Sequence, residues 1–179
     1  MALLIDGYGP VGRLLCARLV ASGTAVAVVG PSAYRAALLC RELEGAGAAA
    51  LPYELDSRDA AALRRLLAEV TAELGRIDCL VDLLPGEAPD YPLANAIRNT
   101  LIGAGRPARI VLVTPQEHAL ETARWVRAAS THQVQVNALA AAAGASTERI
   151  AGAALLLLAV DAQGIGGQLI EVDSAAGPC

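Results

Sequence analysis

Short apolar runs alternate with longer segments of helical periodicity along the whole chain. The apolar runs are bounded by glycine, proline or acidic residues, as strands buried on both faces of a parallel sheet are. Strands are predicted at residues 3–6, 25–29, 49–53, 79–83, 109–114, 134–139 and 168–172. Helices are predicted between them, at residues 11–21, 34–45, 60–74, 93–103, 117–130 and 146–160. This order predicts a Rossmann-like, doubly wound α/β fold with a mostly parallel sheet of about seven strands.

Length and composition fit one domain with a core of small side chains. No repeat, linker or change of composition divides the 179 residues, so a single domain over 1–179 is predicted. Hydrophobic residues make up 55% of the chain, many of them alanine, and there is no phenylalanine. Cys16, Cys40 and Cys79 lie in apolar periodic segments, where buried structural thiols are expected.

Charge and hydropathy argue against two classes of partner. The net charge is −4 and no basic cluster occurs, so no nucleic-acid partner is expected. The longest apolar run, residues 153–160, is far shorter than the roughly 20 residues of a membrane span. The chain opens on a predicted strand without the layout of a signal peptide, so a cytoplasmic protein is expected. No His, Cys or Asp cluster has the spacing of metal ligands.

A glycine loop joins the first predicted strand to the first predicted helix. Gly7, Gly9 and Gly12 fit the G-x-G-x-x-G fingerprint of dinucleotide sites, in the strand-loop-helix context that it requires. Such glycines let the backbone approach a pyrophosphate, and the helix N-terminus supplies free N–H groups and a positive dipole end. Either the loop binds a dinucleotide, or it is a turn that the fold itself requires.

The end of the second strand bears on which dinucleotide would fit. An acidic side chain there would bind a ribose 2′-hydroxyl, and an arginine after it would bind a 2′-phosphate. The strand ends instead in Gly30-Pro31-Ser32. Arg13 and Arg35 are the candidates to reach a 2′-phosphate, which favours NADP over NAD. The alternative is that both are solvated helix arginines.

Four later segments resemble the short-chain dehydrogenase/reductase family, in the family's order. Residues 74–81, L-G-R-I-D-C-L-V, are similar to the stretch before its N-N-A-G loop. Residues 109–114 resemble its fifth strand, and 134–139, V-Q-V-N-A-L, its I-R-V-N-A-V strand. Residues 165–173 resemble its closing I-T-G-Q-x-I-x-V-D-G-G. The resemblance covers nearly the whole chain and points to the ketoacyl-reductase-like branch.

The resemblance implies NAD(P) binding, and hydride transfer by a Tyr-x-x-x-Lys pair with a serine on the fifth strand. In that pair the tyrosine is the acid or base, and the lysine lowers its pKa. This sequence has no lysine, since all 14 of its basic residues are arginine, and no tyrosine follows Tyr91. Thr114 is the residue that would stand in for the serine, but it has no tyrosine to assist it. We therefore assign no catalytic residue, and we leave open whether the chain is an enzyme.

Two further positions follow from the resemblance. Gly86 is the residue kept of the N-N-A-G loop, and Asp56 stands where the family contacts the adenine ring or, equally well, caps the next helix. Glu117 and His118 fall on the expected active-site side, where they would either shuttle protons or be solvated residues of a first helical turn. Tyr91, in the loop after Gly86, would line a pocket on the same side. The predicted NAD(P)-binding set, for a chain that binds either NAD(P) or nothing, is Gly7, Gly9, Gly12, Arg13, Arg35, Asp56 and Gly86.

The missing pair favours a catalytically degenerate homologue that serves as a scaffold or regulatory subunit. Its expected partner is an active short-chain reductase, such as a ketoreductase of fatty-acid or polyketide type, in a hetero- or homo-oligomer. The resemblance implies association through residues 93–103, 117–130 and 168–172, with Trp125 either an anchor of that contact or a core residue. Two alternatives stay open: an NAD(P)-dependent or non-redox enzyme with an altered site, and an NAD(P)-binding sensor.

Overall fold

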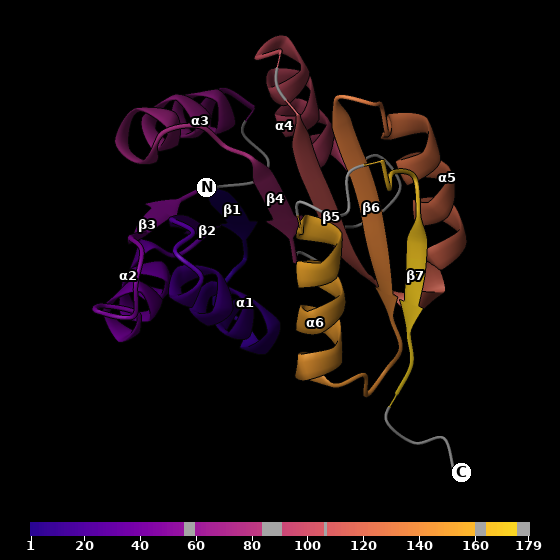
Figure 1. Ribbon diagram of the computed structural model, residues 1–179, viewed down its shortest axis with the longest axis horizontal. Coiled ribbons are helices and arrows are strands. Elements are labelled where there is room, and N and C mark those ends of the chain that lie inside the picture. The colour runs from indigo at the N-terminus through magenta and orange to yellow at the C-terminus, as the bar shows by residue number, and fades with distance from the viewer. Residues whose placement is uncertain (56–59, 84–90, 106, 160–163, 175–179) are drawn as a thin grey trace.

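The predicted parallel sheet is present in the computed structural model, which describes residues 1–55, 60–83, 91–105, 107–159 and 164–174. Within these residues the strand order is β3-β2-β1-β4-β5-β6-β7, and every neighbouring pair is parallel (Figure 1). The strands are β1 (Ala2–Ile5), β2 (Val26–Gly30), β3 (Ala50–Glu54), β4 (Cys79–Asp82), β5 (Ala108–Pro115), β6 (Val134–Ala141) and β7 (Leu169–Val172). The prediction of a doubly wound α/β fold is confirmed.

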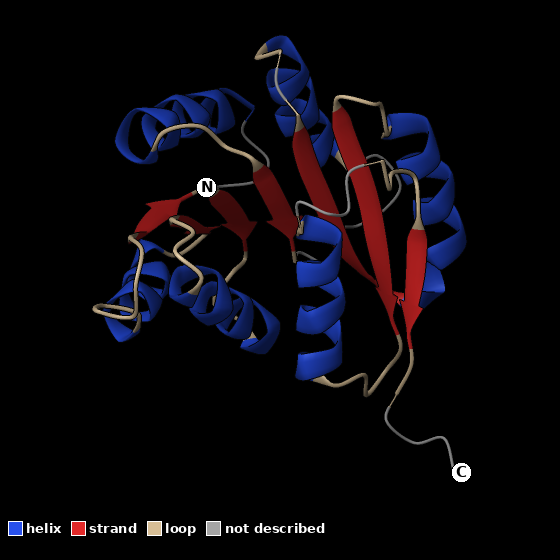
Figure 2. Ribbon diagram, viewed as in Figure 1, coloured by secondary structure: helices blue, strands red, loops and turns tan. Residues whose placement is uncertain are grey.

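Helices cover both faces of this sheet (Figure 2). They are α1 (Pro10–Ala21), α2 (Ala33–Glu42), α3 (Ala60–Leu74), α4 (Pro92–Gly103), α5 (Ala119–Ala129) and α6 (Thr147–Leu158), with a 3-10 turn, η1 (Gln116–His118), before α5. Each face of the sheet has its own hydrophobic cluster: α1, α2 and α6 pack on one face, and α3, α4 and α5 pack on the other. None of the described helices is long and apolar enough to cross a bilayer.

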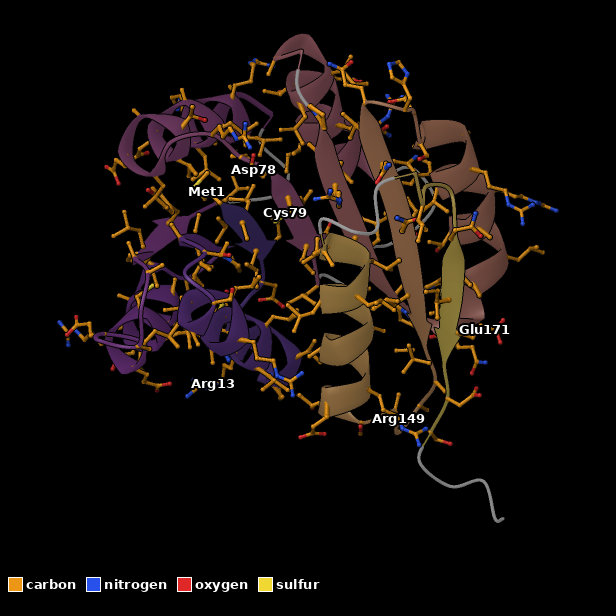
Figure 3. All side chains as sticks on the ribbon, viewed as in Figure 1. Met1, Arg13, Asp78, Cys79, Arg149 and Glu171 are labelled. Carbon is orange, nitrogen blue, oxygen red and sulfur yellow. The ribbon has the colours of Figure 1, made fainter. Side chains whose placement is uncertain are left out.

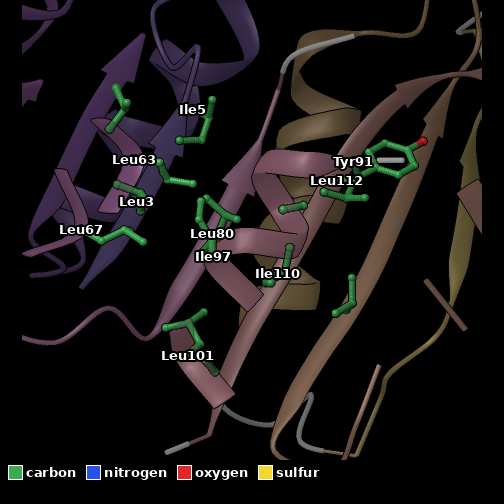
Figure 4. Packing of buried hydrophobic residues seen from close by; sticks show 14 of the residues in the cluster. Leu3, Ile5, Leu63, Leu67, Leu80, Tyr91, Ile97, Leu101, Ile110 and Leu112 are labelled. Atoms are coloured by element: carbon green, nitrogen blue, oxygen red, sulfur yellow. The ribbon is translucent and has the colours of Figure 1, made fainter. Parts of the chain in front are cut away.

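The strands read as continuous apolar runs because both of their faces are buried. Along β1, Leu3 and Ile5 point into the cluster under α3 and α4, whereas Ala2 and Leu4 point into the cluster under α1. Figure 4 shows Leu3 and Ile5 together with Leu80 of the adjacent strand. Because β1, β2, β4 and β5 are parallel, their carboxyl ends lie at one edge of the sheet, where ligands of doubly wound folds bind.

Helix ends differ from the predicted ones for local reasons. Helix α1 starts at Pro10, because proline suits the first helical position. Helix α2 ends at Glu42 rather than at Gly45, whose φ of +79° cannot continue a helix. The segment predicted as one helix over 117–130 divides into η1 and α5. Of the two predicted caps of α6, Ser146 is the one that acts, accepting the Arg149 N–H at 3.2 Å.

The prediction that three cysteines are buried is confirmed, and Cys179 lies outside the described residues. Burial raises the pKa of Cys16 to about 12, and it raises the pKa of Cys40 and of Cys79 to about 11. The three thiols are therefore neutral in the folded chain at physiological pH. Because the thiolate is the reactive form, they are poor nucleophiles there.

We expect the folded Cys179→Ser variant to react with a thiol reagent such as 5,5′-dithiobis(2-nitrobenzoate) far more slowly at about pH 8 than the same variant in guanidinium chloride. The unfolded thiols ionise near pH 9, whereas the folded thiols ionise near pH 11 to 12. The folded state therefore holds more protons in that interval, so the free energy of unfolding stays level below about pH 9 and falls above it. Equally fast labelling of the folded and unfolded variant would contradict this expectation.

Candidate functional site

The glycine loop turns the chain from β1 into α1 at the carboxyl edge of the sheet. Asp6 leaves the strand in the left-handed conformation, with φ at +55°, and Gly9 is the N-cap of α1. A Cβ on Gly12 would lie 2.3 Å from the backbone oxygen of Gly7, so α1 packs directly on the loop there. A Cβ on Gly9 would meet nothing within 4 Å. Gly12 therefore serves close packing, while Gly9 leaves the loop open to approach.

The N-terminus of α1 offers few hydrogen-bond donors. Pro10 has no N–H, and the N–H of Arg13 already donates to the Gly9 carbonyl at 2.9 Å. The N–H groups of Val11 and Gly12 remain in the first turn, at the positive end of the helix dipole. This part of the loop fits a phosphate.

The Tyr8 side chain turns from the loop onto the end of β2. Tyr8 is only 9% exposed. A Cβ added to Gly30 would lie 2.6 Å from Cε1 of the Tyr8 ring and 2.6 Å from the Tyr8 hydroxyl oxygen. The guanidinium of Arg35 lies over the ring, 4.7 Å from the centroid. Burial raises the pKa of the Asp6 carboxyl, and Arg35 and Tyr8 partly offset that rise. Burial, followed by the negative charge of Asp6, raises the pKa of the Tyr8 hydroxyl. Tyr8 thus sits as a neutral ring between Asp6, Gly30 and Arg35.

The arginines predicted to reach a 2′-phosphate both have partners within the protein. Arg13 forms an ion pair with Glu42 at the end of α2, and both side chains are partly exposed. Arg13 lies toward the lower edge in Figure 3, whereas Met1 and Asp78, at the amino ends of β1 and β4, lie above it. Arg35 is exposed, and its guanidinium stacks on the ring of Tyr8. Asp56 and Gly86, the other predicted contacts, lie outside the described residues.

An intact NAD(P) molecule therefore fits this edge only in part. The loop suits a pyrophosphate, but β2 ends on Gly30, which has no side chain to bind a ribose hydroxyl. The Tyr8 ring fills the space beside Gly30. Sequence reasoning missed Tyr8 because it weighed the glycines of the loop and passed over the residue between them.

The end of β5 lacks the residues that hydride transfer in the resembled family needs. Thr114 is buried near the end of β5, and the chain passes through η1 directly into α5, which contains no tyrosine. Glu117 is exposed and His118 is half-buried on η1. Within the described residues no group of three His, Cys, Asp or Glu side chains could hold a metal ion.

Tyr91, the last tyrosine of the sequence, belongs to the core between α4 and α5. Its ring lies 4.8 Å from the ring of Trp125, centroid to centroid, and it is buried (Figure 4). Its hydroxyl lies 2.5 Å from Thr122 Oγ1, which itself donates to the His118 carbonyl. Tyr91 must therefore donate to Thr122, and its proton is committed to a structural hydrogen bond. Trp125 is half-buried and packs against this cluster from α5.

Asn137 of β6 is a buried polar residue with a structural role. Its Nδ2 donates to the Ile165 carbonyl at 2.9 Å, and its Oδ1 accepts the Gln168 N–H at 3.0 Å. Both partners lie in the loop that precedes β7. The asparagine of the V-N-A segment thus ties this loop to the sheet.

Replacing Asn137 by leucine is expected to lower the free energy of unfolding by about 2–4 kcal/mol, because one carbonyl and one N–H lose their partner. Urea denaturation measures this loss, and hydrogen exchange should quicken at residues 165–168. Asn99→Leu, at an exposed position on α4, is the control and should change little. Equal stability of the two variants would show that Asn137 does not hold the loop.

A second feature lies at the opposite, amino edge of the sheet. An open cavity of about 810 Å³ occurs there between the starts of β5 and β6, the end of α5 and the loop before β7. The polar side chains in its lining include Arg109, Arg127, Ser130, His132, Gln135 and Gln168. It lies at the edge opposite the glycine loop, so the two features are separate.

Known proteins are similar to this chain in the sequence of its first half and in fold. Residues 1–83 match the family model described as short chain dehydrogenase. A curated relative, the (2S)-[(R)-hydroxy(phenyl)methyl]succinyl-CoA dehydrogenase subunit BbsC of Thauera aromatica, is 36% identical over 81 residues. That match covers 45% of this chain and 32% of the relative, so it spans about a third of the relative's length.

Solved structures agree along the chain. A short-chain type dehydrogenase/reductase from Mycobacterium ulcerans superposes with a TM-score of 0.82 at 19% identity, covering 96% of this chain and 87% of that one. A 3-ketoacyl-(acyl-carrier-protein) reductase from Brucella melitensis, complexed with NADH, gives 0.80 at 16% identity, covering 97% and 96%. These identities establish the fold alone. In sequence, residues 1–83 are similar to the short-chain dehydrogenase family, and the described chain has the fold of these solved members.

Proposed function

We propose that this chain is a non-catalytic subunit that assembles with an active short-chain reductase. The observation that carries the proposal is the connection from β5 to α5. It runs through η1 alone, without a tyrosine, and the whole sequence contains no lysine. In the resembled family the lysine is the cation that lowers the pKa of the catalytic tyrosine, and this chain has neither residue there.

The remaining aromatic hydroxyl on this side does not replace the missing acid. Tyr91 is buried, and its proton is donated to Thr122. A general acid must reach the reacting oxygen of a substrate with its own proton. Tyr91 would have to leave its contact with Trp125 to do so.

The outer surface of α5 supports an assembly role. Leu120 is 65% exposed in the first turn of α5, and the half-buried Trp125 lies five residues further along the same helix. Tryptophan is a common anchor of protein interfaces, and Leu120 adds an exposed apolar side chain to the same helix. The family resemblance implies association through α4 and α5, so this face is the proposed interface.

The similar proteins support a class of partner. The relative from Thauera aromatica is named as a subunit of a dehydrogenase for a succinyl-CoA derivative. The structural neighbour from Brucella melitensis is named as a reductase of acyl-carrier-protein thioesters. We therefore propose a partner that oxidises or reduces the β-carbon of an acyl thioester and supplies the whole active site.

The test is co-expression of this chain with the short-chain reductase whose gene lies nearest its own. We expect a complex of fixed stoichiometry by size-exclusion chromatography with light scattering, and we expect the chain alone to show no turnover of NADH or NADPH with acyl-thioester substrates. Carbonyl reduction by the purified chain alone would overturn the proposal. Recovery of both proteins only as separate species would also count against it.

A further inference from the structure

We propose that Tyr8 occupies the position in which the adenosine ribose of a dinucleotide would lie, and that it excludes the dinucleotide from this chain. The inference concerns ligand binding and does not rest on the proposed assembly role, because a non-catalytic subunit can bind NAD(P) or not. It follows from the position of Tyr8 relative to the loop, to Gly30 and to Arg35.

The position of the ribose is fixed by the fold. In doubly wound sheets the pyrophosphate lies over the first helix N-terminus, and the adenosine ribose lies at the end of the second strand. Here that strand end is Gly30, and the ring of Tyr8 is the group in contact with it. Two Tyr8 atoms, Cε1 and the hydroxyl oxygen, would each lie 2.6 Å from a Cβ on Gly30. No ribose can enter while the ring stays there.

The missing side chain at Gly30 is what admits the ring. Any other residue at that position would collide with Tyr8, so a strand end carrying a ribose-binding carboxylate and a folded-in Tyr8 exclude each other. The two unusual residues, a tyrosine between the loop glycines and a glycine at the end of β2, are therefore one structural adaptation. Together they replace a ligand contact by a contact within the protein.

Charged neighbours hold the ring in place. Arg35 covers one face of the ring at 4.7 Å, which is the geometry of a cation–π contact. Asp6 stands next to it, in the left-handed conformation. Displacing Tyr8 would uncover Asp6, and its negative charge would face the incoming phosphates. A dinucleotide would therefore have to break the Arg35 contact and also bind beside a carboxylate.

The experiment uses ADP-ribose, which carries the adenosine and the pyrophosphate but no nicotinamide, so the missing catalytic residues do not affect the result. Isothermal titration calorimetry of the unmodified chain is expected to show no saturation up to about 1 mM. The Tyr8→Ser variant removes the ring and is expected to bind at least about tenfold more tightly. Tyr34→Ser, which removes a tyrosine 77% exposed on α2, is the matched control and should behave as the unmodified chain.

Two further measurements keep the inference testable if Tyr8→Ser does not fold. Gly30→Ala displaces the ring from the other side of the contact and should also increase the affinity for ADP-ribose. Hydrogen exchange of residues 6–12 in the unmodified chain should be unchanged by about 1 mM ADP-ribose. The inference is overturned if the unmodified chain binds ADP-ribose as tightly as the variants, or if ADP-ribose protects residues 6–12. Failure would leave the assembly proposal standing, since that proposal is tested by complex formation and turnover.

Discussion

Replacing Gly12 by alanine is expected to destabilise the chain by about 3 kcal/mol, although alanine is the better helix former by about 1 kcal/mol. The added Cβ would lie 2.3 Å from the oxygen, 2.4 Å from the carbon and 2.6 Å from the Cα of Gly7. All three are backbone atoms, so the collision cannot be relieved by a rotamer change. Either α1 moves away from the sheet or the loop changes its path, and both changes disturb the packing of Leu15 and Cys16.

Gly9→Ala is the matched control, because it adds the same methyl group to the same loop. The backbone at Gly9 is extended, with φ at −72°, and a Cβ there meets nothing within 4 Å. Its expected cost is at most about 1 kcal/mol, from the poorer N-cap. Urea denaturation of both variants measures the difference. Equal destabilisation would show that the close approach of Gly12 to Gly7 is not what fixes the loop.

This pair of substitutions separates the two reasons for which a chain keeps a glycine loop. Gly12 is required by the contact between α1 and the turn, whether or not a nucleotide is bound. Gly9 is the position whose openness would serve a ligand. A G-x-G-x-x-G pattern therefore survives in a chain whose ribose position is filled by Tyr8, because part of the pattern is a packing requirement.

The sheet and its helices could be predicted because local patterns of apolar and polar residues determine which segments form strands and helices. A strand such as β1 is buried on both faces, so all four residues from Ala2 to Ile5 are apolar, and Asp6 is the first polar residue after them. The first and last residues of the helices could not be predicted as well, because capping and turn conformations determine them. The φ of +79° at Gly45, which ends the turn after α2, is one example.

For the candidate site, the sequence predicted the position of the backbone loop but not the contacts of the side chains around it. The position of the glycine loop follows from its place after the first strand, and the lack of a Tyr-x-x-x-Lys pair follows from the absence of lysine. The positions of the side chains depend on contacts between segments that are distant in the sequence. Tyr8 folds onto Gly30 only because β1 and β2 are neighbours, and Arg13 meets Glu42 only because α1 and α2 share a face.

Replacing Leu120 by glutamate is expected to weaken the proposed complex with an active reductase by at least about 30-fold in Kd, which corresponds to a contact worth about 2 kcal/mol. The substitution would place a charge in the apolar part of the proposed interface on α5. It should leave the chain itself stable, since Leu120 is 65% exposed and an acidic residue is favourable in the first turn of a helix.

Leu38→Glu is the control for this prediction. Leu38 is also an exposed leucine, at 45%, but it lies on α2, on the other face of the sheet from α4 and α5. Both variants should unfold near the same urea concentration, and only Leu120→Glu should lose the partner in a surface plasmon resonance titration. Equal binding by both variants would exclude α5 from the interface, whereas equal loss would mean that charge anywhere on the surface disturbs assembly. Only a loss specific to Leu120→Glu would show that a chain without the Tyr-x-x-x-Lys pair uses the surface of α5 to bind a partner.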